Sequence, residues 1–428
     1  MRPASNCASF WWSWDMSEYF TPLNVGNNIT ELPKSTLPAS AEDNAGHYPF
    51  FCSSAEVKAT TTWLQERPTV LMGTGGVASV NYGEDRFAYS TDTWGFRSNN
   101  AKLATKFLFR KIQQHLPRID YAGFEGSGLR HLRKDFVKKL KIDVPSPTVQ
   151  SKIVEILDSH DCAIEKTEAL IAKYQQIKAG LMHNLFTRGV TADGKLRPPR
   201  EQAPELYYET PIGWIPKAWG CKTLEELLAS VGNNFRSGPF GSALLKSELV
   251  ENGIPFLGID NVHAEHFEAT FRRFVSLSKF SALNRYAVRP KDVVITIMGT
   301  VGRCCVLPED ICEALSSKHL WTMTFDQSQV IPELICWQLN YAPWVLSWFK
   351  RRAQGAVMDA IQSSTLKTLR LPVPLMSEQQ EIFKKYAECN SKIDSEQANL
   401  RKLQMEKLGL MHDLLTGKVR VNPDTVPA

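Results

Sequence analysis

Two long stretches of the chain place apolar residues at alternating intervals of four and three positions. In the first stretch these residues are Ile153, Leu157, Ile164, Ile171, Tyr174, Leu181 and Leu185, with His160, Thr167 and Lys178 in the remaining slots. In the second they run through Ile382, Tyr386, Cys389, Ile393, Glu396, Leu400, Leu403, Lys407, Leu410 and Leu414. A period of about 3.5 residues, sustained over roughly four heptads, predicts two long helices that form a coiled coil. The alternative is that each helix only packs on its own domain.

The two helical stretches are also copies of each other. Residues 140–190 align without a gap with residues 369–419, and 17 of the 51 aligned positions are identical. The run Gly180-Leu181-Met182-His183 recurs as Gly409-Leu410-Met411-His412. Solenoid repeats have periods of roughly 20–50 residues, so an offset from 140 to 369 indicates two half-molecules in tandem, with pseudo-twofold symmetry.

The segments outside the helices consist of short apolar runs broken by glycine and proline. Such runs occupy 47–51 and 69–74 in the first half, and 254–259, 271–277 and 292–299 in the second. They predict mainly β globules with a few helices, and hence an α/β (α+β) fold class. Met72-Gly73-Thr74 aligns with Met298-Gly299-Thr300 at an offset of 226, and Ser90 aligns with Ser316. We therefore interpret the two globular segments as divergent copies.

Composition limits the function classes only slightly. The chain has 428 residues, a net charge of +5 and 43% hydrophobic residues. From Arg97 to Lys141 there are twelve Lys and Arg against three acidic residues, a density suited to phosphate, although such a run can also be a solvated charged face. Nine dispersed cysteines indicate free thiols in a reducing cytoplasm, and no apolar run is long enough to span a membrane.

The sequence offers no catalytic, metal or cofactor motif that we can assign. Residues 189–196 have the spacing of a phosphate-binding loop, but Leu196 stands where a Ser or Thr would hold Mg²⁺, and the segment follows a helix. A methyltransferase would need a glycine-rich cofactor turn and an Asn/Asp-Pro-Pro-aromatic site, and neither occurs. We expect no metal and no cofactor.

Three segments carry a resemblance to a known family. They are Pro211 to Trp219 (PIGWIPKAW), Asp292 to Arg303 (DVVITIMGTVGR), and the helix from Glu378-Gln379-Gln380-Glu381-Ile382 to Gly409–Lys418 (GLMHDLLTGK). From about residue 17 to 420 the chain resembles the specificity subunit of type I DNA restriction-modification enzymes. The first half departs from the pattern, because it lacks the Gly-Trp-x-Pro lead-in and has Val149 before Gln150 where the second copy has Glu378-Gln379. Met16 is the expected natural start.

The resemblance implies a non-catalytic subunit with the following organisation. Residues 1–16 are an N-terminal extension, 17–143 target recognition domain 1, 144–190 helical repeat 1, 191–210 a linker, 211–371 target recognition domain 2, 372–419 helical repeat 2 and 420–428 a tail. Each recognition domain would read one half of a split site in double-stranded DNA. The two repeats would form an antiparallel coiled coil that docks two copies of the methyltransferase subunit, with restriction subunits joining through the complex.

Candidate contact residues follow from side-chain chemistry near the glycine turns and the basic run. For DNA they are Thr74, Ser79, Asp92, Arg97, Arg130 and Arg133 in the first domain, and Arg236, Ser237, Lys246, Thr300, Arg303, Lys318 and His319 in the second. For the partner they are Lys173, Lys178, Lys402 and Lys407. The alternative for each is a plain surface or turn residue. The rival functions are a fused DNA methyltransferase or nuclease, and a coiled-coil adaptor without a DNA role.

Overall fold

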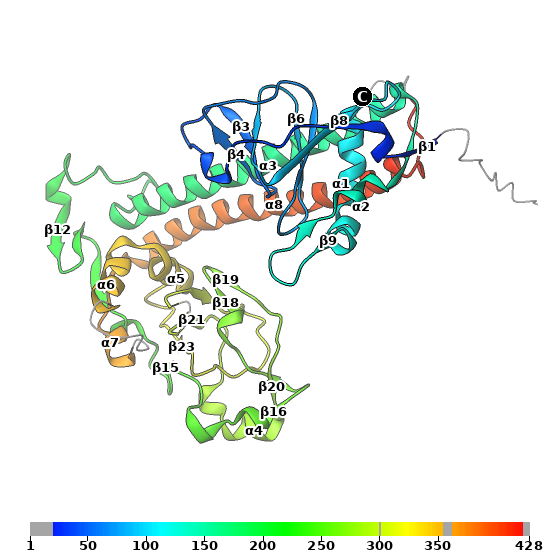
Figure 1. Ribbon diagram of the computed structural model, residues 1–428. Helices are drawn as coiled ribbons and strands as arrows, with labels where there is room; N and C mark the ends of the chain where they lie inside the picture. The colour runs from blue at the N-terminus through cyan, green and yellow to red at the C-terminus, as the bar shows by residue number, and fades with distance from the viewer. Residues whose placement is uncertain (1–19, 299–300, 354–361, 423–428) are drawn as a thin grey trace, which may run out of the picture. The chain divides into compact units, whose positions relative to one another are not determined.

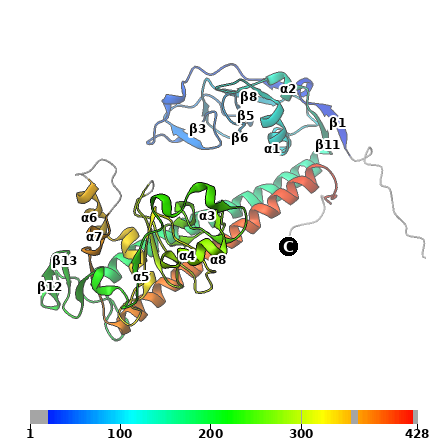
Figure 2. The ribbon, with the colours of Figure 1, turned by 90° about the horizontal axis from the view of Figure 1, so that it is seen from below.

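Two long helices, α3 (Pro147–Thr187) and α8 (Met376–Leu415), run through a chain that divides into two units (Figures 1 and 2). The computed structural model describes residues 20–298, 301–353 and 362–422. Unit 1 comprises Met1–Leu170 and Glu396–Ala428, and unit 2 comprises Ile171–Ser395. Each unit therefore holds a part of each long helix. Met16 and Thr300, for which predictions were made above, lie outside the described residues.

Unit 1 is built on a four-stranded antiparallel sheet with the strand order β2-β8-β5-β6. Its strands are β1 (Thr21–Asn24), β2 (Ile29–Glu31), β3 (Tyr48–Phe51), β4 (Val57–Thr60), β5 (Thr69–Gly73), β6 (Val80–Gly83), β7 (Ala88–Tyr89), β8 (Thr93–Ser98), β9 (Phe124–Glu125), β10 (His131–Leu132) and β11 (Lys141–Val144). Helix α1 (Thr105–Ala122) packs on β5 and β6, because one face of it buries Phe107, Leu108 and Ile112. A short helix, α2 (Lys134–Lys138), leads into β11, which pairs with β1.

Unit 2 repeats this plan with the sheet β15-β23-β21-β22. Its strands are β12 (Tyr207–Thr210), β13 (Gly213–Pro216), β14 (Gly220–Thr223), β15 (Phe235–Arg236), β16 (Leu249–Val250), β17 (Ile254–Pro255), β18 (Val262–His263), β19 (His266–Phe267), β20 (Phe274–Val275), β21 (Val293–Thr296), β22 (Cys304–Val306), β23 (Leu320–Met323) and β24 (Arg370–Val373). Its shorter helices are α4 (Leu277–Ala282), α5 (Pro332–Tyr341), α6 (Pro343–Ala353) and α7 (Ser363–Lys367). Strand β24 pairs with β14, as β11 pairs with β1 in unit 1. Both halves contain helices as well as strands, which is the mixed α/β composition expected from the sequence.

The strand registers correct one alignment made from the sequence. Met72 lies opposite Trp94 in unit 1, and Ile295 lies opposite Trp321 in unit 2. Ile295 rather than Met298 therefore corresponds to Met72, and the alignment of Met72 with Met298 is wrong by three residues on this strand. The connections between equivalent strands differ in length, so no single offset aligns all of them.

Within each unit the two long helices run in opposite directions. In unit 1, Ile153 and Leu157 of α3 share a core with Met411 and Leu414 of α8. In unit 2, Phe186 near the end of α3 shares a core with residues at the start of α8, Ile382 and Tyr386. Both predicted helices are thus present. Their apolar positions are buried near the helix ends, as at Leu157 and Leu414, and several towards the middle, such as Ile164 and Leu403, are half-buried.

A buried glutamine joins each long helix to the domain that precedes it. The Gln150 side chain accepts a hydrogen bond from the Ala104 amide at 2.9 Å and donates to the carbonyls of Lys102 at 2.7 Å and Pro145 at 2.8 Å. In unit 2 the equivalent Gln379 makes the same three bonds, to the Ile331 amide at 3.0 Å and to the carbonyls of Gln329 at 2.7 Å and Pro374 at 2.9 Å. Both amides satisfy backbone groups that would otherwise be buried without partners.

The residue before each of these glutamines is Glu378 in unit 2 and Val149 in unit 1, and the structure explains this difference. Glu378 is buried and accepts hydrogen bonds from the Val190 amide at 2.8 Å, Arg197 Nη2 at 2.8 Å and Trp219 Nε1 at 2.9 Å. Val149, its counterpart in unit 1, lies in an apolar core. The carboxylate is therefore present in the unit where an arginine and an indole need an acceptor.

Candidate nucleic-acid interface

Hollow 1 lies in unit 1 where β5 and β8 meet, and it has a volume of about 310 Å³. Thr74 follows β5, and both its amide and its hydroxyl donate to the Asp92 carbonyl at 2.9 Å. The Thr74 carbonyl accepts from the Leu132 amide at 3.0 Å, which brings the β10 strand and His131 alongside. Lys34 and Lys134 complete a polar rim, and both are exposed. Hollow 1 therefore combines cationic side chains with one exposed carboxylate, that of Asp92.

Hollow 2 lies in unit 2 beside the start of β23 and has a volume of about 370 Å³. Its lining includes three of the predicted residues, Lys246, Lys318 and His319, together with an apolar wall that contains Leu244 and Phe256. Both lysines are exposed. Burial lowers the pKa of His319, and the nearby charges of Lys318 and Arg273 lower it further, so this imidazole is neutral at pH 7.

A hydrogen-bonded turn lines each hollow at an equivalent place in the sheet. The Thr93 amide donates to the Ser90 carbonyl at 3.1 Å, and the Leu320 amide donates to the Ser317 carbonyl at 3.1 Å. Strands β8 and β23 begin at the last residues of these two turns. Ser90 therefore corresponds to Ser317, one residue beyond the Ser316 that the sequence alignment gave. The residues at the centre of the turns are Thr91-Asp92 and Lys318-His319.

Several predicted residues of unit 1 lie elsewhere or are already bound. Ser79 is 5% exposed, so the prediction that it contacts DNA is not supported by its position. Arg97 lies on β8 and donates to Gln65 at 2.8 Å and to Thr69 at 3.2 Å, and burial lowers its pKa. Arg130 pairs with Asp120 at 3.4 Å, and Arg133 pairs with Glu125 at 2.7 Å. Only part of the basic run is therefore free to meet phosphate.

Two predicted residues of unit 2 are structural. Arg236 is 5% exposed and pairs with the fully buried Asp292, so its assignment to DNA binding is wrong in this structure. Burial raises the pKa of the Asp292 carboxyl, although Arg236 opposes this shift. Ser237 is 6% exposed, and its hydroxyl donates to the Lys318 carbonyl at 3.3 Å. Arg303 is exposed.

The four lysines predicted to bind a partner divide into two pairs. Lys178 pairs with Glu265 at 2.6 Å and lies over the Tyr386 ring, and Lys407 pairs with Asp161 on the facing helix. These two hold each unit together, which contradicts their assignment as free docking residues. Lys173 and Lys402 are exposed at equivalent positions of the repeat. Lys402 pairs with Glu406 of its own helix at 3.7 Å, but its side chain is 74% exposed, so both lysines remain accessible to a partner.

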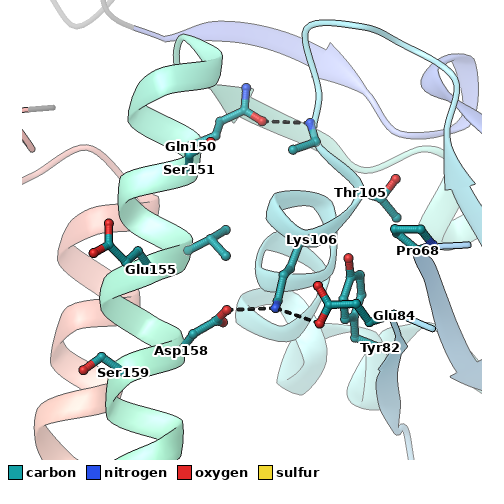
Figure 3. Close-up of a pocket in the computed structure, with 12 residues that line it drawn as sticks. Pro68, Tyr82, Glu84, Thr105, Lys106, Gln150, Ser151, Glu155, Asp158 and Ser159 are labelled. Carbon is teal, nitrogen blue, oxygen red and sulfur yellow. Dashed lines mark hydrogen bonds and ion pairs between the residues drawn. The ribbon is translucent and has the colours of Figure 1, made fainter.

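A larger hollow of about 770 Å³ lies between α1, β6 and α3 in unit 1 (Figure 3). Lys106 points into it and pairs with Asp158 at 2.9 Å and with Glu84 at 3.3 Å. The ammonium also lies 5.2 Å from the Tyr82 ring centre. Burial, together with Glu84 and Asp158, raises the pKa of Tyr82 to about 12. Because two carboxylates face one lysine, this hollow is unsuited to phosphate. The ion pairs of Lys106 instead connect Glu84, which follows β6, to Asp158 of α3.

A buried lysine of α1, Lys111, contacts the end of α8 and provides a test of unit 1. Lys111 Nζ donates to the Leu415 carbonyl at 2.6 Å, and burial lowers the pKa of Lys111 from 10.5 to about 8. Below pH 8 the lysine is charged in the folded and the unfolded chain, so the burial cost is fully present. As the pH rises from 8 towards 10.5, only the folded chain has lost the proton, so the free energy of unfolding rises.

We therefore expect wild type to gain up to about 3 kcal/mol relative to Lys111→Met between pH 7 and 10.5, since one pKa unit is worth about 1.4 kcal/mol. Chemical denaturation across this range measures the difference. Lys102→Met, at an exposed position of the same unit, is the control and should follow wild type. Parallel pH dependences of wild type and Lys111→Met would show that Lys111 does not titrate in this way.

Within the described residues, no group of three or more His, Cys, Asp or Glu side chains could hold a metal ion. In the same part of the chain, no helix is both long and apolar enough to cross a membrane.

Comparison with known proteins identifies the class. The family described as "Type I restriction modification DNA specificity domain" matches residues 28–176 and 217–407. These two ranges cover more than half of the chain, so the chain belongs to this family, whose members supply the specificity subunit. The resemblance inferred from the sequence is thereby confirmed, as is a specificity subunit rather than a fused methyltransferase or nuclease.

Two curated relatives are described as specificity subunits of type I restriction enzymes. The chain is 24% identical over 422 residues to the type I restriction enzyme MjaVIII specificity subunit of Methanocaldococcus jannaschii, which covers 93% of this chain and 92% of the relative. It is 28% identical over 149 residues to the EcoDI specificity subunit of Escherichia coli, which covers 35% of this chain and 33% of the relative.

Solved structures share the fold. The S subunit of a type I restriction-modification system from M. genitalium has a TM-score of 0.60 at 16% identity, and the match covers 92% of this chain and 96% of that one. A chain from a structure of type I system assembly and conformational transition has a TM-score of 0.52 at 16% identity, covering 94% and 98%.

Lys34 and His131 are residues of hollow 1 that the sequence analysis missed. They lie far along the chain from Thr74 and Asp92, and only strand pairing brings them together. His131 lies within the basic run from Arg97 to Lys141, whereas no pattern in the sequence marks Lys34.

Proposed function

We propose that this chain reads a bipartite site in double-stranded DNA, with hollow 1 and hollow 2 facing the two half-sites. The target recognition domains would be residues 17–143 and 211–371. The observation that carries the proposal is the occurrence of one sheet plan twice, with a polar hollow beside the equivalent turn in both copies. Because the side chains around the two turns differ, the two half-sites should differ in sequence.

We also propose that helical repeats 144–190 and 372–419 form an antiparallel coiled coil with pseudo-twofold symmetry, connected through the linker 191–210. The opposed packing of the two helices within each unit supports this arrangement. Equivalent helix faces around the exposed Lys173 and Lys402 would dock two copies of a methyltransferase subunit, and restriction subunits would join through that complex. Access to chromosomal DNA implies a cytoplasmic protein.

The decisive experiment is selection of a randomised duplex library by the purified full chain at low salt, followed by sequencing. We expect two short, dissimilar motifs separated by an unread spacer. An adaptor without a DNA role would select no motif, and that result would refute the proposal. Mass measurement of the complex co-expressed with its methyltransferase should give two partners per chain, whereas a stable one-to-one complex would contradict the twofold arrangement.

A further inference from the structure

The two equivalent turns present opposite hydrogen-bonding chemistry. The turn of unit 1 carries Asp92 as its third residue, the counterpart of His319, and the turn of unit 2 carries Lys318 as its second residue, the counterpart of Thr91. Both side chains are exposed and line their hollows. Within the described residues, no hydrogen bond or ion pair engages either the Asp92 carboxylate or the Lys318 ammonium. The backbone around each side chain is nevertheless fixed, because the Asp92 carbonyl accepts from Thr74 and the Lys318 carbonyl accepts from Ser237.

Asp92 is chemically unsuited to the DNA backbone. A carboxylate cannot donate a hydrogen bond, and it repels phosphate. The lysines on the same rim, Lys34 and Lys134, are suited to phosphate instead. If DNA occupies hollow 1, the carboxylate must face a base edge that offers a donor. In the major groove that donor is the amino group of cytosine or adenine.

Lys318 has the opposite requirement. An ammonium donates only, and the base edge with two adjacent acceptors is guanine, through O6 and N7. The neutral His319 beside it adds no competing positive charge. The second cation of hollow 2, Lys246, comes from a separate segment and can serve a phosphate.

We propose that this turn is the base-reading element of both units, in which Asp92 selects a base bearing an amino group in one half-site and Lys318 selects guanine in the other. The assignment rests on the proposed function, because it presupposes that the hollows face DNA. Under this assignment, the base preferred at one position of each half-site depends on one side chain, Asp92 or Lys318. Because the two residues lie in different units, each should act on its own half-site alone.

The test is the same library selection, performed with full-length variants. Asp92→Asn keeps the shape but removes the charge, and Asp92→Lys replaces the acceptor with a cationic donor like that of Lys318. We expect Asp92→Asn to change the preference for cytosine or adenine at one position of one half-site by roughly tenfold or more. Asp92→Lys should convert that position to guanine. Lys318→Met should remove a guanine preference in the other half-site only.

Matched controls are Asp85→Asn and Lys217→Met, which change exposed residues outside both hollows and should leave the motif as in wild type. Thermal unfolding of each variant confirms that it is folded. A wild-type motif that Asp92→Lys and Lys318→Met leave unchanged overturns the assignment while the proposed function stands. Failure of the wild-type chain to select any motif overturns the proposed function, and the assignment with it.

Discussion

Replacing Asp292 with alanine should lower the free energy of unfolding by about 3–5 kcal/mol, the cost of leaving a buried charge without its partner. Arg236 is the charge left behind, and its side chain is only 4% exposed. The Asp292 carboxylate also accepts from the Arg289 amide at 2.7 Å and from the Thr324 hydroxyl at 2.5 Å. The substitution therefore orphans one cation and two further donors.

Chemical denaturation of the full chain measures this loss. Asp310→Ala is the matched control, because Asp310 is an exposed carboxylate of the same unit, and surface substitutions usually change stability by less than about 0.5 kcal/mol. The double variant Arg236→Met with Asp292→Leu should recover much of the loss, since apolar residues of similar volume can replace a buried ion pair. Equal stability of the Asp292→Ala and Asp310→Ala variants would show that the pair contributes little.

The long helices could be predicted because their signal is local. A heptad pattern needs only residues a few positions apart, so residues such as Ile153 and Leu157 reveal the buried face directly. The repeat then linked the two halves without any structural information. Aligning β5 with its counterpart β21 was harder, because the two strands share so few identical residues that a shift of three positions is hard to detect. Only the cross-strand partners Trp94 and Trp321 fixed the register.

The site was predicted in part, and the errors have a common cause. Arginine suits phosphate, base edges and buried carboxylates equally well, so its chemistry alone could not separate Arg303 from Arg236. The partner of Arg236 is Asp292, which lies 56 positions away in the chain. Lys178 was misassigned for the same reason, since its partner Glu265 lies 87 positions away. Long-range pairing decides which charged side chains remain free, and a single sequence does not record it.

Neutralising Lys34 and Lys134 together should weaken binding to all DNA sequences and reduce its salt dependence. Each lost phosphate contact should lower the slope of log affinity against log salt by about 0.9, so the pair should lower it by about 1.8. Both lysines are exposed on the rim of hollow 1. Lys134 Nζ lies over the Trp94 ring, 5.4 Å from the ring centre. These two should therefore matter more than Arg130 and Arg133, whose charges are already paired within unit 1.

The measurement is a titration of Lys34→Gln/Lys134→Gln against specific and nonspecific duplexes at several salt concentrations. The control is Lys102→Gln/Lys166→Gln, which removes the same charge at exposed positions that do not line hollow 1. We expect affinity at low salt to fall by roughly tenfold or more for the hollow variant alone, with the selected motif unchanged because phosphate contacts carry no direct sequence information. If both double variants lose the same affinity and slope, the effect comes from net charge, and hollow 1 does not bind the DNA backbone. A changed motif would instead mean that Lys34 or Lys134 contacts a base edge.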